Sequence, residues 1–114
     1  MDYLDPGSAE VEGVKVPPHS QEAEQSVLGG LMLDNNAWDA VSEIVLEDQF
    51  YRHDHRLIFR TIEKLVGNMQ PIDVVTISEE LDRTANLDAA GGLDYLVELA
   101  RNTPSASNIR AYAE

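Results

Sequence analysis

Residues 19–39, HSQEAEQSVLGGLMLDNNAWD, decide the fold, because they contain a whole helix with a start signal and a stop signal. Ser20 is a favourable N-cap, since its hydroxyl can accept a hydrogen bond from an otherwise unpaired backbone N–H. Residues 34–36, Asp-Asn-Asn, end this helix and cap the next, because short Asx side chains bond to neighbouring backbone. Between these signals, apolar residues recur at three- and four-residue steps, as on one helix face: Ala23, Val27, Leu28, Leu31 and Met32.

Gly29 and Gly30 lie inside this predicted helix and weaken it. Each glycine in a helix interior costs about 1 kcal/mol relative to alanine. The pair is tolerable if a neighbouring helix packs closely against it, and the alternative is a kink or an end of the helix at that point. We expect close packing.

Composition indicates one soluble domain. The chain has 114 residues, 43% of them hydrophobic, and no cysteine, so disulfides and thiolate sites are excluded. No run approaches the ~20 apolar residues of a membrane span, and the acidic start lacks the pattern of a signal peptide. A cytoplasmic location is expected. The net charge of −13 opposes binding to a phosphate backbone and favours basic protein partners.

The remaining pattern predicts an all-α fold, a compact orthogonal bundle of about five to six short helices. We expect a disordered tail at residues 1–16, a helical domain at 17–104 and the unfinished start of a helical hairpin at 105–114. A second helix is expected from Trp38, a core-filling residue, through Val45, because Trp38, Val41, Ile44 and Val45 repeat at helical spacing. Further helices are expected at 53–66, from the N-cap Asp73 onward, and at 93–101.

The helix expected at 53–66 has cations at every fourth residue. This basic stripe consists of Arg52, Arg56, Arg60 and Lys64, half of the eight cations in the chain. One interpretation is that the stripe binds an acidic partner or a phosphate group. The other, which we prefer, is that it forms a solvated face neutralised by acidic residues of the same chain. His53 and His55 point about 160° apart on a helix, so we reject a metal site there.

The helix expected at 93–101 is apolar on two sides. One stripe contains Leu93, Leu96, Val97 and Ala100, while Tyr95 and Leu99 project on another side. Patches of that size are seldom left in water, so part of this surface is expected in an interface. The apolar positions chosen for a partner or oligomer interface are Leu93, Tyr95, Leu99, Ile109 and Tyr112.

Motifs for catalysis are missing from the sequence. There is no GxxxxGK[ST] phosphate loop, no GxSxG and no HExxH. The many carboxylates are spread over predicted helix exteriors, where solvation explains them. We therefore expect no catalytic, cofactor or metal site in this chain.

An ordered set of motifs resembles the N-terminal domain of bacterial replicative DNA helicases of the DnaB family. The motifs are VPPHSQEAEQSVLGGLMLDNNAWD, EDQFYRHDHRLIF, PIDVVTISEEL and LDAAGGLDYLVELARNTPSASNIRAYA, and they extend from Val16 to about Ala113. The resemblance implies a non-catalytic helical domain that dimerises and forms the collar of a hexamer. It also implies docking of primase and helicase-loader proteins, with ATP, magnesium and DNA handled by a separate motor domain at the bacterial replication fork.

Two alternatives from other classes stay open. One is a small helical nucleic-acid-binding module that uses the basic stripe. The other is a helicase-binding adaptor, because the primase's helicase-interacting domain has a related helical fold by family resemblance.

Overall fold

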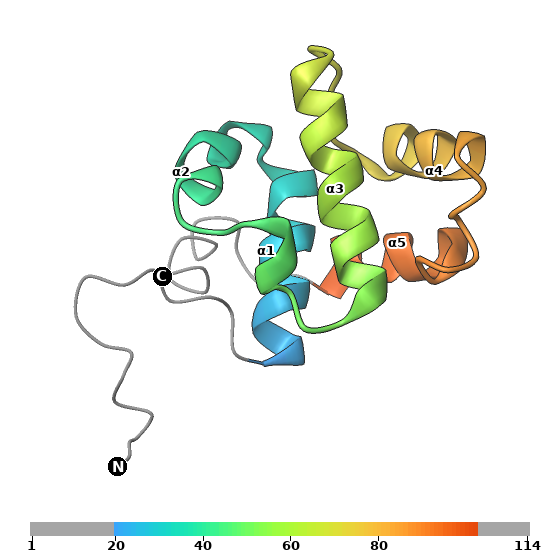
Figure 1. The fold of residues 1–114 in the computed structure, drawn as a ribbon, viewed down its shortest axis with the longest axis horizontal. Coiled ribbons are helices and arrows are strands. Elements are labelled where there is room, and N and C mark those ends of the chain that lie inside the picture. Colours follow the sequence, from blue (N-terminus) through green and yellow to red (C-terminus); the bar gives the residue numbers. More distant parts are fainter. Residues whose placement is uncertain (1–19, 103–114) are drawn as a thin grey trace.

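The computed structural model describes residues 20–102, and every regular element in this range is helical (Figure 1). The elements are α1 (Gln21–Leu33), η2 (Asn35–Ala37), α2 (Trp38–Ser42), η3 (Glu47–Gln49), α3 (His53–Gly67), α4 (Val74–Arg83) and α5 (Gly92–Asn102). The prediction of an all-α bundle is confirmed. None of the helices in this part of the chain is long and apolar enough to cross a membrane.

Helix α3 lies at the centre of the bundle. It packs against α1 on one side and α4 on the other, and α5 packs against both α1 and α4. Figure 1 shows α4 and α5 running across the direction of α1 and α3, which is the orthogonal arrangement expected. The core comprises Val27, Leu28, Leu31, Met32, Val41, Val45, Phe50, Leu57, Ile58, Phe59, Ile62, Leu65, Ile72, Ile77, Leu81, Ala90, Leu96 and Leu99.

Helix α1 begins and ends where its sequence signals place it. The Ser20 hydroxyl accepts a hydrogen bond from the Ala23 N–H at 3.0 Å. Asp34 follows the last helical residue, and its carboxylate accepts from the Asn36 N–H at 3.1 Å. The helix continues through Gly29 and Gly30, which are both buried. The helix therefore does not end at the glycines. Their burial agrees with the expectation that neighbouring parts of the chain pack closely against them.

The second predicted helix is shorter than its sequence pattern suggests. Residues 35–37 form a 3₁₀ turn, and α2 ends at Ser42, although Val41 and Val45 are both buried. Trp38 is half-buried and packs against the core, with its ring centroid 5.4 Å from that of Phe59. The side chains of Trp38, Val41 and Val45 face the core, although the backbone is α-helical only as far as Ser42.

Asn35 connects the end of α1 to the segment before α4. Its amide nitrogen donates to the carbonyls of Leu31 at 2.9 Å and Ile72 at 2.8 Å. Its amide oxygen accepts from the Ile72 N–H at 2.8 Å, so both backbone groups of a buried residue are satisfied. Ile72 is thereby fixed beside the N-cap of α4, where Asp73 and Thr76 form a reciprocal capping box.

Replacing Asn35 with alanine is expected to lower the free energy of unfolding by about 1–3 kcal/mol, because two backbone groups of Ile72 lose their partners. Urea denaturation followed by circular dichroism measures this loss. Asn36→Ala is the matched control, since Asn36 is adjacent and exposed like Asn35, whereas both bonds to Ile72 come from Asn35. Equal stability of the two variants would contradict the bridging role of Asn35.

A glycine pair leads into α5. Gly91 has φ of +103° and Gly92 has φ of +80°, both in the region that favours glycine. A Cβ on Gly91 would lie 2.8 Å from atoms of the Tyr95 side chain, whereas a Cβ on Gly92 would meet nothing within 4 Å. This turn therefore brings the backbone directly against the tyrosine.

The structure shows which side of the two-sided apolar helix α5 is buried. Leu96 is fully buried and Leu99 is 3% exposed, whereas Leu93 is 49% exposed. Leu96 and Leu99, which the sequence pattern assigned to different sides of the helix, both lie in the core, because α1 and α4 pack against α5 along the line through these two residues. The expected tail at 1–16 and the expected hairpin start at 105–114, with Ile109 and Tyr112, lie outside the described residues.

Candidate functional site

A carboxylate and an imidazole are paired in the interior of the bundle. Glu24 of α1 is 1% exposed and His55 of α3 is 0% exposed. The Glu24 Oε1 atom lies 2.7 Å from His55 Nδ1. The other carboxylate oxygen accepts from the Tyr51 N–H at 2.6 Å, and Oε1 also receives the Arg52 N–H at 3.5 Å. The carboxylate therefore joins α1 to α3 and to the loop that precedes α3.

Tyr95 of α5 extends this network to a third helix. Its hydroxyl lies 2.6 Å from His55 Nε2 and receives a hydrogen bond from the Gln25 side-chain amide at 3.1 Å. The Arg52 guanidinium lies over the Tyr95 ring, with Cζ 5.5 Å from the ring centroid. We call Glu24, His55 and Tyr95 the buried triad; it connects α1, α3 and α5.

Donor and acceptor matching fixes the tautomer of His55. An ionised carboxylate only accepts hydrogen bonds, so His55 Nδ1 must carry the proton that points to Glu24. Nε2 is then an acceptor, and the Tyr95 hydroxyl donates to it while accepting from Gln25. Every polar group of the buried triad has a partner in this state.

Burial shifts the pKa values of His55 and Tyr95 in opposite directions. It lowers the pKa of His55 below the ordinary value of 6.5, against an opposing effect of the hydrogen bond to Glu24. It also raises the pKa of the Tyr95 hydroxyl, which therefore stays protonated at neutral pH. The hydrogen bonds between His55 and Glu24 and between Tyr95 and His55 connect three helices through their side chains.

Stability is expected to fall on acidification because of His55. Its pKa is lower in the folded chain than in the unfolded one, so the unfolded state binds a proton first. The stability that neutral His55 contributes is fully present above about pH 6.5 and is lost as the pH falls through the folded-state pKa. Urea denaturation between about pH 7.5 and about pH 5 measures the slope. A His55→Gln variant should show a smaller slope, and an unchanged slope would contradict this assignment.

Glu24 and His55 were not predicted from the sequence as a pair. Glu24 lies in the first turn of α1, where an acid complements the helix dipole without having to be buried. A signal was present, because Glu24 lies three and four residues before Val27 and Leu28, on the buried stripe of α1. His55 has the same relation to Ile58 and Phe59 on α3. A titratable residue in phase with an apolar stripe predicts a buried position.

The basic stripe makes its contacts within the domain. Arg52 pairs with Asp54 at 2.5 Å, Arg60 with Glu47 at 3.1 Å and Lys64 with Glu80 at 2.6 Å. Arg56 donates instead to the carbonyls of Phe50 at 2.9 Å and Tyr51 at 2.8 Å. Hydrogen bonds from Arg83 and Lys64 lower the pKa of Glu80 to about 2. Three of the four cations thus have an acid of the same chain beside them, as in the solvated-face interpretation.

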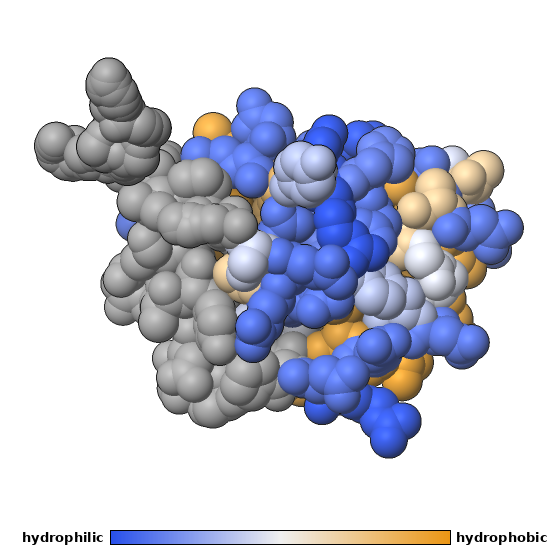
Figure 2. Space-filling view, turned by 90° about the horizontal axis from the view of Figure 1, so that it is seen from below, coloured by the Kyte–Doolittle hydropathy of each residue, from blue (hydrophilic) through white to orange (hydrophobic). Residues whose placement is uncertain are grey.

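The described interface candidates on α5 differ in accessibility. Leu93 is 49% exposed, Tyr95 is half-buried in the triad, and Leu99 is 3% exposed in the core. Leu93 is therefore the best placed of the three to meet a partner. Other large apolar residues are also exposed, and our sequence analysis did not select them; they are Leu33, Leu46, Tyr51, Met69 and Val75. In Figure 2 the orange apolar areas are interrupted by blue polar ones.

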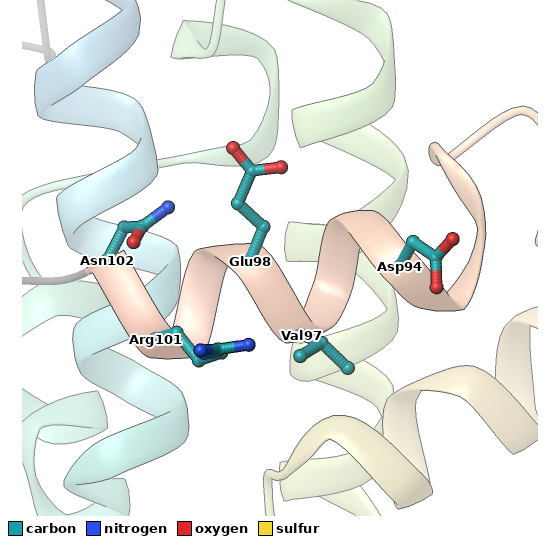
Figure 3. Close-up of a pocket in the computed structure, with 5 residues that line it drawn as sticks. All are labelled: Asp94, Val97, Glu98, Arg101 and Asn102. Atoms are coloured by element: carbon teal, nitrogen blue, oxygen red, sulfur yellow. The ribbon is translucent and has the colours of Figure 1, made fainter.

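A shallow hollow of about 410 Å³ lies along α5. The described residues that line it are Asp94, Val97, Glu98, Arg101 and Asn102, drawn in Figure 3. Figure 3 shows the Glu98 carboxylate directed away from Val97 and Arg101, so these side chains do not converge on one point. Across residues 20–102, no group of three His, Asp or Glu side chains could hold a metal ion.

The fold and its contacts define an acidic, all-helical domain whose buried polar groups connect helices. Comparison with protein families matches residues 16–114 to the family described as DnaB-like helicase N terminal domain. The chain belongs to this family.

Relatives and a solved structure agree with this assignment. The chain is 53% identical over 96 residues to the replicative DNA helicase DnaB of Buchnera aphidicola subsp. Acyrthosiphon pisum, covering 84% of this chain and 21% of the relative. It is 52% identical over 101 residues to the replicative DNA helicase DnaB of Haemophilus influenzae, and the match covers 89% of this chain and 22% of that helicase. The crystal structure of the N-terminal domain of DnaB helicase from Mycobacterium tuberculosis matches with a TM-score of 0.81 and 41% identity, covering 86% of this chain and 70% of that one. The chain thus spans about a fifth of the length of these helicases.

Proposed function

We propose that this chain is the collar domain of a bacterial replicative DNA helicase, which acts in the cytoplasm at the replication fork. In this role it holds helicase subunits together as dimers within a hexamer and docks primase or loader proteins. The observation that carries the proposal is the family match over residues 16–114, together with about 50% identity to replicative helicases over about a fifth of their length. Unwinding itself belongs to another part of such a protein.

The chain's own residues do not fit a nucleotide site. The sequence has no GxxxxGK[ST] loop to hold phosphates and magnesium. In the proposal, ATP and magnesium bind in the motor region of the longer protein, and this domain contributes assembly contacts. The net charge of −13 favours basic partner surfaces.

Self-association through Leu93 is the testable part of this proposal. Sedimentation is expected to show dimerisation that grows with concentration. Leu93→Asp should weaken it by about tenfold or more, the effect of removing one apolar anchor from an interface. Val75→Asp is the matched control, because Val75 is a 60% exposed residue on α4. A strict monomer at high concentration, both for this chain and for one extended beyond Glu114, would count against the collar role.

The nucleic-acid alternative predicts a different result. Salt-dependent binding of an oligonucleotide, lost when Arg52, Arg56, Arg60 and Lys64 are reversed in charge, would support it. Because three of these side chains pair with carboxylates of the same chain, we expect no binding at low salt. The adaptor alternative predicts instead that the chain binds an intact replicative helicase without replacing one of its subunits.

A further inference from the structure

A second hollow, of about 270 Å³, lies between the start of α2 and the C-terminal end of α3. Its apolar lining comes from Trp38 of α2, Val66 of α3, and Met69 and Ile72 of the segment after α3. Figure 1 shows this end of α3 extending above α2 and α4. Pockets for small-molecule ligands usually enclose about 300–1,000 Å³. The hollow is smaller than that, so its size suits a single side chain of another molecule.

Met69 is the most exposed residue of this apolar lining. Its side chain is 94% exposed, and its φ of +59° lies in the left-handed region. Here α3 ends in a Schellman motif, in which the Met69 N–H donates to the Val66 carbonyl at 3.0 Å and the Gln70 N–H to the Leu65 carbonyl at 2.8 Å. Helix α4 ends in the same motif with Ala85. The motif therefore needs no long side chain, yet α3 places one in water beside the hollow.

The charges around the hollow favour a cation. Asp39 lies exposed on its rim, and no basic residue of the described chain lines it. Within residues 20–102, the Asp39 carboxylate has no ion-pair partner. The last carbonyls of α3 add a partial negative charge. Lys64, the basic residue in the last turn of α3, pairs with Glu80 at 2.6 Å instead of neutralising this end.

The composition of the lining favours arginine over lysine. A planar guanidinium stacks on an aromatic face, whereas an ammonium is compact and strongly hydrated. Tryptophan is the best aromatic partner for such a cation. The oxygens of Asp39, Asn36 and Gln70 on the rim are acceptors for the five guanidinium N–H donors. The aliphatic part of the arginine side chain then packs against Met69.

We propose that this hollow binds one arginine side chain of a basic segment of another protein. The guanidinium lies against the Trp38 indole and pairs with Asp39, while the aliphatic stem contacts Met69. The inference rests on the proposed function for the existence of a protein partner, and it gives that docking a location and a chemistry. Collar assembly is measured separately by sedimentation and Leu93→Asp, so a failure of the arginine site leaves the collar role unaffected.

Blocked amino acids test the arginine site on the unaltered chain. N-acetyl-L-argininamide is expected to shift the NMR signals of the Trp38 indole N–H and the Met69 methyl group. Its Kd should be about 1 mM, the range for a ligand of about fifteen non-hydrogen atoms. Trp38 is the only tryptophan in the sequence, so its indole signal is unambiguous. N-acetyl-L-citrullinamide has nearly the same shape without the charge and should bind about fivefold or more weakly.

Two variants identify the residues that hold the arginine probe. Asp39→Asn and Met69→Gly should each weaken its binding about two- to fivefold, the range for single contacts at an exposed site. Glycine is favoured at the φ of +59°, so Met69→Gly should not lower the midpoint of urea unfolding. Asp48→Asn is the matched control, because it makes the same charge change at an exposed residue of η3 that does not line the hollow.

Four results would overturn the proposal. The first is an unchanged Trp38 signal at about 10 mM N-acetyl-L-argininamide, tenfold above the expected Kd. The second is equal binding of the citrulline compound. The third is an equal loss of binding in Asp39→Asn and Asp48→Asn, which would indicate attraction to the overall charge. The fourth is loss of self-association in Met69→Gly without any response to the arginine probe, which would assign the hollow to a second copy of this chain.

Discussion

Replacing Glu24 with alanine is expected to lower the free energy of unfolding by about 3–5 kcal/mol, because two donors lose their acceptor and the removed side chain leaves a cavity. The carboxylate accepts from His55 Nδ1 at 2.7 Å and from the Tyr51 N–H at 2.6 Å. Without it, both donors are left without a partner, and each unsatisfied buried group costs about 1–3 kcal/mol. Removal of the Glu24 side chain also leaves a cavity among buried residues of α1 and α3.

Urea denaturation at neutral pH measures this effect, with Glu22→Ala as the control. Glu22 lies two residues earlier on the same helix and is exposed, so its removal should cost less than about 1 kcal/mol, the contribution of an acid at a helix N-terminus. Losses of similar size in both variants would show that the interior carboxylate has no special role.

Replacing Phe59 with alanine is expected to cost about 3–5 kcal/mol through loss of buried surface and creation of a cavity. Phe59 is 1% exposed, and its ring centroid lies 5.4 Å from that of Trp38 and 5.0 Å from that of Phe50. The substitution therefore removes two aromatic contacts, each worth about 0.5–1.5 kcal/mol beyond burial.

Two further variants test this explanation by thermal or urea denaturation. Phe59→Leu keeps most of the volume and should lose distinctly less stability than the alanine variant. Met69→Ala, at a side chain that is 94% exposed, should be close to neutral. A loss for Phe59→Ala no larger than that for Met69→Ala would contradict the packing described here.

Local signals predicted the helix boundaries well where the determinants lie within a few residues. The caps at Ser20 and Asp73 depend on side chains that bond three residues along the chain, so the sequence displays them directly. Helix α2 was predicted too long, because the Trp38, Val41 and Val45 spacing is satisfied by a short helix followed by a turn that buries the same side chains. Periodicity identifies a face but does not determine how long the backbone stays helical.

Contacts between distant segments were harder to predict. The triad joins residues 24, 55 and 95, and nothing local specifies that these three meet. Which side of α5 is buried also depends on distant segments, because the helix is apolar on two sides and only the packing of α1 and α4 decides between them. The partners of the basic stripe also come from elsewhere, since Glu47 and Glu80 belong to other elements than Arg60 and Lys64.

The two glycines at the start of α5 impose different restrictions on mutation. Position 91 is restricted twice, by a backbone φ of +103° and by a Tyr95 side chain that would lie 2.8 Å from any added Cβ. Position 92 is restricted once, by a φ of +80° with open space around it. Asparagine and aspartate tolerate that backbone region better than other residues, so they are the permitted replacements at 92. No such replacement exists at 91 while Tyr95 keeps its place, and a change there requires a second change in the tyrosine's position.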